Sequence, residues 1–309
     1  MRADAAPVSA VAPAVVSQAF RRVYDSAGMN IPEPLAGQVR VNQVALAYLD
    51  WGGSGGPIIV LHATGLLGRV YRPIIEALRS VGHVFSYDQR GHGDSGPAPA
   101  PDGYDWTITM QDLAGFIRTM GFKSVRAFGH SAGGTAIGSL ATEQPELISR
   151  AVLVEPVLFE QTSGPVWGNP LYERTLKRRR EFDSVDAMFA NFDTKPPYDL
   201  WRKDILRDYC EFGTWPTSAG KRVLKCAPET EARIYQTSRD FDGLSRVLRA
   251  EQPMLIVFGE RGNLFGSHLA DRIAAERKHG RVMNVPRAGH FLPMEQPHLI
   301  AELASEFLA

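Results

Sequence analysis

The sequence predicts an α/β protein built on a doubly wound, mostly parallel sheet, and two observations lead to this prediction. Short apolar runs such as Ile58–Leu61 have the pattern of parallel strands that are buried on both faces. These runs alternate with longer amphipathic stretches such as Thr107–Met120, whose spacing is typical of helices. This alternation favours a parallel sheet that is covered by helices on both faces and joined by right-handed crossovers.

The individual elements can be placed in order along the chain. Alternating apolar and polar residues predict a hairpin from Gln38–Arg40 and Val44–Asp50, before a glycine-rich break at residues 51–57. Mostly apolar runs predict inner strands at Ile58–Leu61, His83–Tyr87, Ser124–Phe128, Ala151–Val154, Met254–Phe258 and Arg281–Val285. Helical periodicity predicts helices at Tyr71–Ser80, Thr107–Met120, Thr135–Gln144, Ser267–Lys278 and Glu295–Phe307.

Residues 156–245 interrupt this alternation of strands and helices, because they show helical periodicity and no clear buried strand. Because the insertion lies between two strands, it must emerge beside the carboxyl edge of the sheet, where ligands bind in open α/β sheets. We expect a helical cap at 156–245, a core formed by 31–155 and 246–309, and a loosely packed N-terminal arm at 1–30. The aromatic residues of the cap predict a pocket for a substrate with an apolar portion; they are Trp167, Tyr172, Phe182, Phe189, Phe192, Trp201, Tyr209 and Trp215.

Composition argues against several classes of partner. The 34 basic and 34 acidic residues cancel, so no overall field would attract nucleic acid. The basic run Lys177–Arg180 is predicted to be the solvated face of a helix.

Cys210 and Cys226 are expected to be free thiols, with a single bridge as the alternative, and no metal or phosphate motif predicts a cofactor. No segment has a signal-peptide pattern or the roughly 20 apolar residues of a membrane span, so a cytoplasmic location is expected.

The segment Gly129-His-Ser131-Ala-Gly133 is the strongest chemical signal, because it lies between a predicted strand and a predicted helix. A serine at such a sharp turn has its hydroxyl lifted clear of the backbone, and side chains at the two glycines would clash. The N-terminus of the following helix favours developing negative charge. Ser131 is therefore the candidate nucleophile.

A serine hydroxyl needs a base within hydrogen-bond reach. His290 follows the last predicted strand and a glycine, Gly289, which allows a tight loop. The order nucleophile, then histidine, makes His290 the candidate base.

Four segments together resemble the α/β-hydrolase superfamily: residues 61–65 (Leu-His-Ala-Thr-Gly), 88–95 (Asp-Gln-Arg-Gly-His-Gly-Asp-Ser), 129–133 and 289–290. The resemblance runs from Val39 to the C-terminus and is weakest in the insertion. It implies a serine esterase with an oxyanion hole made by the backbone N–H groups of Thr64 and Ala132, each contributing roughly 3–4 kcal/mol. The family usually has glycine where Ala63 stands. Residues 88–95 are expected to be scaffold.

The third member of the triad departs from the family pattern. The family usually places an aspartate three residues after the glycine that ends the strand Met254–Phe258, and this chain has Gly262 there. Some members place the acid after the preceding strand, where this chain has Glu155. Glu155 is therefore the first candidate and Glu260 the second. A pair without an acid, or an acid not yet identified, is a further alternative.

These residues predict a carboxylic ester hydrolase that works through an acyl-serine. A C–C bond hydrolase, a lactonase, and an amidase or aminopeptidase would use nearly the same residues. Ser131 argues against an epoxide hydrolase or haloalkane dehalogenase, which have an aspartate at that position. A non-catalytic ligand-binding protein on the same scaffold is the alternative from a different class, and Gly262 is the residue that favours it. The sequence does not specify an oligomeric state.

Overall fold

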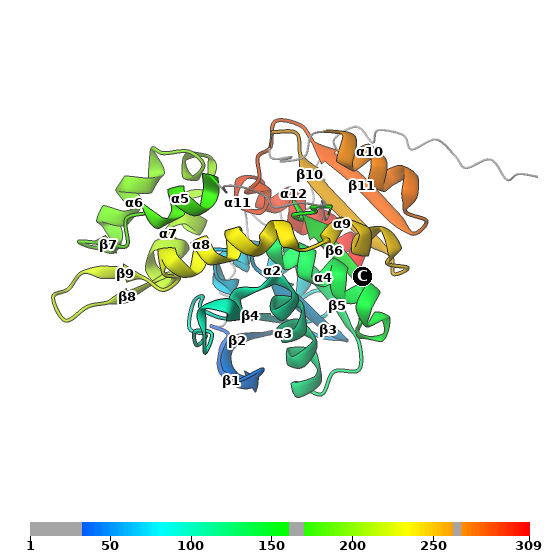
Figure 1. Cartoon of the computed structure of the whole chain (residues 1–309), viewed down its shortest axis with the longest axis horizontal. Helices are drawn as coiled ribbons and strands as arrows, with labels where there is room; N and C mark the ends of the chain where they lie inside the picture. Colours follow the sequence, from blue (N-terminus) through cyan, green and yellow to red (C-terminus); the bar gives the residue numbers. More distant parts are fainter. Residues whose placement is uncertain (1–32, 161–169, 262–266) are drawn as a thin grey trace, which may run out of the picture.

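A computed structural model describes residues 33–160, 170–261 and 267–309, and an eight-stranded sheet forms its centre (Figure 1). The strand order is β1-β2-β4-β3-β5-β6-β10-β11. β2 runs antiparallel to β1 and β4, and every other pair is parallel. The predicted doubly wound, mostly parallel sheet is thus confirmed. The strands are β1 (Leu35–Val41), β2 (Val44–Gly52), β3 (Pro57–Leu61), β4 (His83–Tyr87), β5 (Val125–His130), β6 (Ile148–Val154), β10 (Met254–Gly259) and β11 (Gly280–Val285).

Helices cover both faces of the sheet, which explains why the inner strands are apolar throughout. In β3, Ile58 and Val60 pack into a cluster with α2 (Arg72–Leu78) and α12 (Pro297–Leu308). The alternate residues Ile59 and Leu61 pack into the cluster on the opposite face. The helices of that face are α3 (Trp106–Thr119), α4 (Ala132–Glu143), α9 (Gly243–Arg249) and α10 (Ser267–Glu276).

The predicted helix Glu295–Phe307 is divided in two. A short helix α11 (Leu292–Glu295) ends before Gln296, and α12 begins at Pro297. Proline suits the first turn of a helix, because its missing N–H would have no partner there, but it cannot continue one. Short 3₁₀ turns lie at Gly68–Tyr71, Pro101–Tyr104, Pro145–Leu147, Tyr198–Leu200 and Ser238–Asp240.

The insertion between β6 and β10 contains a small sheet as well as helices. Its helices are α5 (Pro170–Leu176), α6 (Val185–Asp193), α7 (Lys203–Phe212) and α8 (Pro228–Thr237). Three antiparallel strands, β7 (Glu181–Phe182), β8 (Thr214–Pro216) and β9 (Arg222–Leu224), were not predicted. Strands of two or three residues are too short to show an alternating pattern. In Figure 1 these elements lie together to one side of the main sheet, and α8 leads back toward the core.

Most of the cap's aromatic residues form its interior. Phe182, Phe192, Trp201 and Tyr209 are buried together, whereas Trp215 is half exposed. Trp167 lies outside the described residues. Burial of these side chains shows that they hold the cap together, so the pattern that predicted a ligand pocket is largely a packing pattern.

The basic run Lys177–Arg180 was predicted to be the solvated face of a helix, and for Arg178 this is wrong. These residues form the turn between α5 and β7, and the Arg178 side chain is largely buried, with 16% of its surface exposed. It donates hydrogen bonds to Glu231 (2.5 Å), to the hydroxyl of Tyr198 (3.1 Å) and to the hydroxyl of Tyr209. Burial opposes the charged form, but the two tyrosines and Glu231 raise the pKa of Arg178 well above its usual value. Sequence pattern did not reveal this ion pair because its members lie 53 positions apart.

We expect Glu231→Ala to lower the free energy of unfolding by about 3–5 kcal/mol, because the Arg178 charge would stay buried without its carboxylate. Denaturant unfolding of the two proteins would measure the difference. Glu229→Ala is the matched control, since it removes an exposed partner of Arg180 and is expected to cost less than about 1 kcal/mol. Equal losses in the two variants would contradict the prediction.

Every helix in the part of the chain that the structure describes is too short or too polar to cross a bilayer.

Candidate active site

Ser131 lies on the sharp turn between β5 and α4, as the sequence predicts. Its backbone has φ 53° and ψ −121°, a conformation that a residue with a side chain rarely adopts. The Ser131 N–H donates to the Val154 carbonyl of β6 (2.9 Å), so the strained turn is held from the neighbouring strand. The side chain is consequently fixed at the carboxyl edge of the sheet.

Both glycines of the turn are required by close backbone approach. A Cβ at Gly133 would lie 2.3 Å from the carbonyl oxygen of Leu61, and one at Gly129 would lie 2.7 Å from the backbone of Gly133. These distances are shorter than any ordinary van der Waals contact. The first turn of α4 therefore packs directly on the loop that follows β3.

The structure brings Ser131, His290 and Glu155 together from the ends of three strands. The Ser131 hydroxyl lies 3.0 Å from His290 Nε2, and His290 Nδ1 lies 3.0 Å from Glu155 Oε2. Ser131 and Glu155 are buried, and His290 is partly exposed. Because an ionised carboxylate only accepts hydrogen bonds, His290 carries its proton on Nδ1, and Nε2 is free to accept the serine proton.

Glu155 is held by the neighbouring strand β10. Its Oε1 accepts the backbone N–H of Gly259, at the end of β10, and its own N–H donates to Val257 of the same strand (2.7 Å). Like Ser131, Glu155 has a positive φ, 50°, which turns its side chain across the end of the sheet. It joins two neighbouring strand ends.

The second candidate acid lies elsewhere. Glu260 is exposed, and its carboxylate accepts the backbone N–H of Arg287 (2.8 Å). No hydrogen bond joins Glu260 to His290 within the described residues. Gly262 is outside the described residues.

In the loop after β3, the backbone N–H of Thr64 has no protein acceptor among the described residues, whereas the N–H groups on either side of it are hydrogen-bonded. The Ala63 N–H donates to the Tyr71 hydroxyl (3.0 Å), and the Gly65 N–H donates to His92 Nε2 (2.9 Å). Among the described residues, neither the intervening Thr64 N–H nor the Ala132 N–H donates to a protein acceptor. Thr64 and Ala132 belong to the two segments that Gly133 brings into contact. Both amides thus lie in adjoining segments without a protein acceptor among the described residues.

Residues 88–95 act as scaffold for this loop. His92 accepts the Gly65 N–H, and the Gln89 N–H donates to His62 Nε2 (2.9 Å). Arg90 forms a buried ion pair with Asp112 of α3 (2.6 Å). The turn thus fixes the β3 loop to the body of the core.

The three buried imidazoles around the site stay neutral at physiological pH. Burial, and to a smaller extent the nearby His290, lowers the pKa of His130 to about 3. Burial also lowers the pKa of His62 and of His92. No charge on these rings competes with the pair formed by His290 and Glu155.

The cap reaches the site beside His290. The ring of Phe291, the next residue, packs against Trp201 (5.2 Å between centroids) and Tyr198 (6.3 Å). On the other side, a Cβ at Gly65 would lie 2.8 Å from Glu231 Oε1, so the cap's buried ion pair sits against the β3 loop. The cap thus contacts both the histidine loop and the loop of the free amide.

Sequence reasoning missed several residues that hold this site, above all Tyr71 and His130. Tyr71 carries no motif, and His130 occupies a variable position of the Gly-x-Ser-x-Gly pattern. Both are fully buried and hydrogen-bonded to each other (2.7 Å). No sequence signal could have found Tyr71, because its partners come from distant segments.

Comparison with known proteins is consistent with the fold. A model of the Alpha/beta hydrolase family matches residues 58–303. The 2-(acetamidomethylene)succinate hydrolase of Mesorhizobium japonicum is 25% identical over 258 residues, 83% of this chain and 89% of that protein. The soluble epoxide hydrolase of a Corynebacterium strain is 22% identical over 296 residues, 88% of this chain and 96% of that protein. The crystal structure of E-2-(acetamidomethylene)succinate hydrolase has a TM-score of 0.75 at 23% identity, covering 89% of this chain and 99% of its own.

Proposed function

Because the chain belongs to the alpha/beta hydrolase family, we propose that it is a serine hydrolase that cleaves a carboxylic ester, or a related carbonyl compound, through an acyl-serine intermediate. The observation that carries the proposal is the pair of 3.0 Å contacts that join Ser131 to His290 and His290 to Glu155. This is the arrangement that activates a serine hydroxyl.

In the first step, Ser131 Oγ attacks the carbonyl carbon while His290 Nε2 takes the hydroxyl proton. Glu155 keeps the other imidazole proton on Nδ1 and stabilises the imidazolium. The oxygen of the tetrahedral intermediate accepts hydrogen bonds from the Thr64 and Ala132 amides, which have no protein acceptor among the described residues. His290 then gives its proton to the leaving oxygen as the carbon–oxygen bond breaks.

The acyl-serine is released by water. His290 takes a proton from the water as its oxygen attacks the acyl carbon, and returns that proton to Ser131 Oγ when the acid leaves. Each of these steps uses a side chain or an amide of the chain itself.

Amide hydrolysis is the second candidate, and one observation favours it. The Mesorhizobium relative is named for the hydrolysis of an acetamidomethylene succinate. An amide requires the same nucleophile and the same oxyanion donors, but His290 must protonate a leaving nitrogen. Epoxide hydrolysis, the activity named for the Corynebacterium relative, is not favoured, because Ser131 stands where an aspartate nucleophile is needed.

A fluorophosphonate probe tests the proposal directly. We expect it to form a covalent adduct on Ser131, located by peptide mass spectrometry, and we expect His290→Ala to slow labelling sharply. A screen of p-nitrophenyl esters of graded chain length, with lactones and acetamides, would then identify the bond that is cleaved. If Ser131 stays unlabelled and no member of the screen is turned over, the proposal is wrong.

A further inference from the structure

A continuous chain of hydrogen bonds runs beneath the proposed site. The Ala63 N–H donates to the Tyr71 oxygen (3.0 Å), Tyr71 pairs with His130 Nδ1 (2.7 Å), and His130 Nε2 pairs with the carbonyl of His290 (2.8 Å). The directions are fixed by the two ends. An amide can only donate, so the Tyr71 oxygen accepts from Ala63 and gives its own proton to His130. A carbonyl can only accept, so His130 Nε2 is the protonated nitrogen.

This series of hydrogen bonds joins the three loops whose relative positions determine the proposed reaction. Ala63 precedes Thr64, the residue with the free amide, in the loop after β3. His130 is the last residue of β5 and precedes Ser131. The third loop is joined through the backbone carbonyl of His290 itself. Each loop comes from a different strand, so nothing in the local sequence sets the distances between them.

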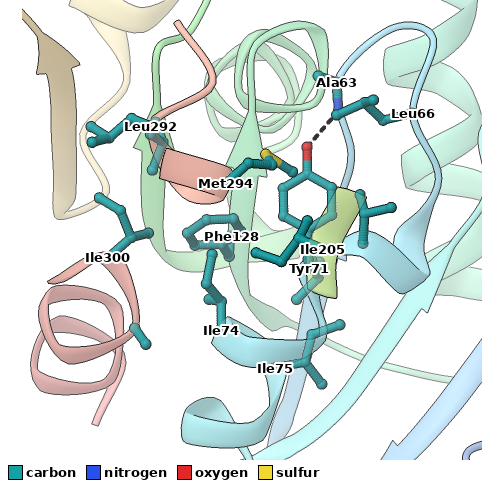
Figure 2. Close-up of a cluster of buried hydrophobic side chains, with 14 of the residues drawn as sticks. Ala63, Leu66, Tyr71, Ile74, Ile75, Phe128, Ile205, Leu292, Met294 and Ile300 are labelled. Atoms are coloured by element: carbon teal, nitrogen blue, oxygen red, sulfur yellow. Dashed lines mark hydrogen bonds between the residues drawn. The ribbon is translucent and has the colours of Figure 1, made fainter. Parts of the chain in front are cut away.

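Packing holds the central hydroxyl in place. Figure 2 shows the Tyr71 ring among Phe128, Ile205 and Met294, with its hydroxyl directed to the Ala63 amide. Tyr71 and His130 are both 0% exposed, so water does not compete for these hydrogen bonds. If the Tyr71 hydroxyl were removed, the Ala63 N–H and His130 Nδ1 would both be buried without a partner. Such groups are costly, and the loop after β3 would shift to satisfy its amide.

We propose that Tyr71 and His130 are positioning residues, which hold the Thr64 amide and the His290 imidazole at the spacing needed to stabilise the oxyanion formed on Ser131. The inference rests on the proposed function. Among the described residues, neither side chain hydrogen-bonds to Ser131 Oγ or to the imidazole of His290, although the His130 ring packs on that imidazole (5.4 Å between centroids). Both residues act through the loops that they join. A displacement of about 1 Å in such an arrangement costs about 100-fold in rate.

Tyr71→Phe tests the proposal, with Tyr87→Phe as the matched control. Tyr87 is also buried, but its hydroxyl has no hydrogen-bond partner among the described residues. We expect Tyr71→Phe to lower kcat for the best ester of the screen by about 10-fold to 100-fold, with KM changed by less than about twofold. We expect Tyr87→Phe to leave kcat unchanged. Equal kcat in the two variants would overturn the proposal, even if both were less stable than the parent.

A double-mutant cycle adds a second readout. His130→Gln and Tyr71→Phe both break the same hydrogen bond, so their combination is expected to lower kcat little more than the more damaging single change. Fully multiplicative effects would mean that the two residues do not act as a unit.

Hydrogen exchange separates failure of this proposal from failure of the proposed function, because it needs no turnover. Relative to Tyr87→Phe, we expect Tyr71→Phe to speed amide exchange in residues 62–65 and 289–291 and to leave the distant strand β1 unchanged. Unchanged exchange in those loops would overturn the positioning role whether or not the protein cleaves esters. Faster loop exchange in a protein whose Ser131 stays unlabelled and that cleaves no member of the screen would contradict the proposed function alone.

Discussion

Replacing Ser131 with alanine is expected to reduce ester turnover by roughly 10⁴-fold to 10⁶-fold. The hydroxyl is the only protein group that the proposed mechanism bonds to substrate carbon, and it lies 3.0 Å from His290 Nε2, the proposed base. The oxyanion donors would remain, so a small residual rate above the uncatalysed one is expected. Steady-state kcat and KM, measured on protein of verified fold, would give the loss.

Ser139→Ala is the matched control for this change. Ser139 lies on α4, is fully buried, and its hydroxyl has no partner among the described residues. We expect its kcat to equal that of the parent. A ligand-binding protein without activity would behave differently: the parent would turn over no ester, and Ser131→Ala would bind the ligand undiminished.

The parts of the fold and site that the sequence could predict are those encoded by local pattern. Runs such as Ile58–Leu61 are apolar because both faces of β3 are covered, and the strands lie where the runs predict them. Ser131 was found through Gly129 and Gly133, which are needed for close backbone approach, and His290 through its place after Gly289 and the last strand. The structure brings both residues together with Glu155, and their catalytic roles stay predictions.

The parts that could not be predicted depend on contacts between distant segments. The sequence left Glu155 and Glu260 as alternatives, because both follow strands; the positive φ of Glu155 and its contact with Gly259 are tertiary features. Arg178 was misplaced for the same reason, since a basic run is solvated unless a distant carboxylate meets it. The cap's three short strands have only two or three residues each, too few to show the alternation of apolar and polar residues that predicts a strand.

Glu155→Gln is expected to lower kcat by about 10³-fold to 10⁴-fold while the protein stays folded. The reason lies in the two partners of the carboxylate. The Gly259 N–H can only donate, so it selects the amide oxygen of the new side chain. The amide NH₂ then faces His290 Nδ1, where it must donate. His290 is forced to carry its proton on Nε2 and can no longer accept the proton of Ser131.

Glu260→Gln gives the comparison that decides between the two acids. The Glu260 carboxylate accepts the Arg287 N–H, and an amide oxygen can do the same. This variant is therefore expected to keep full kcat and a pH profile like that of the parent. A large loss in Glu260→Gln with none in Glu155→Gln would assign the acid to the other loop, and it would require the segment after β10 to rearrange during turnover. Equal activity in both variants and the parent would mean that Ser131 and His290 work without a carboxylate.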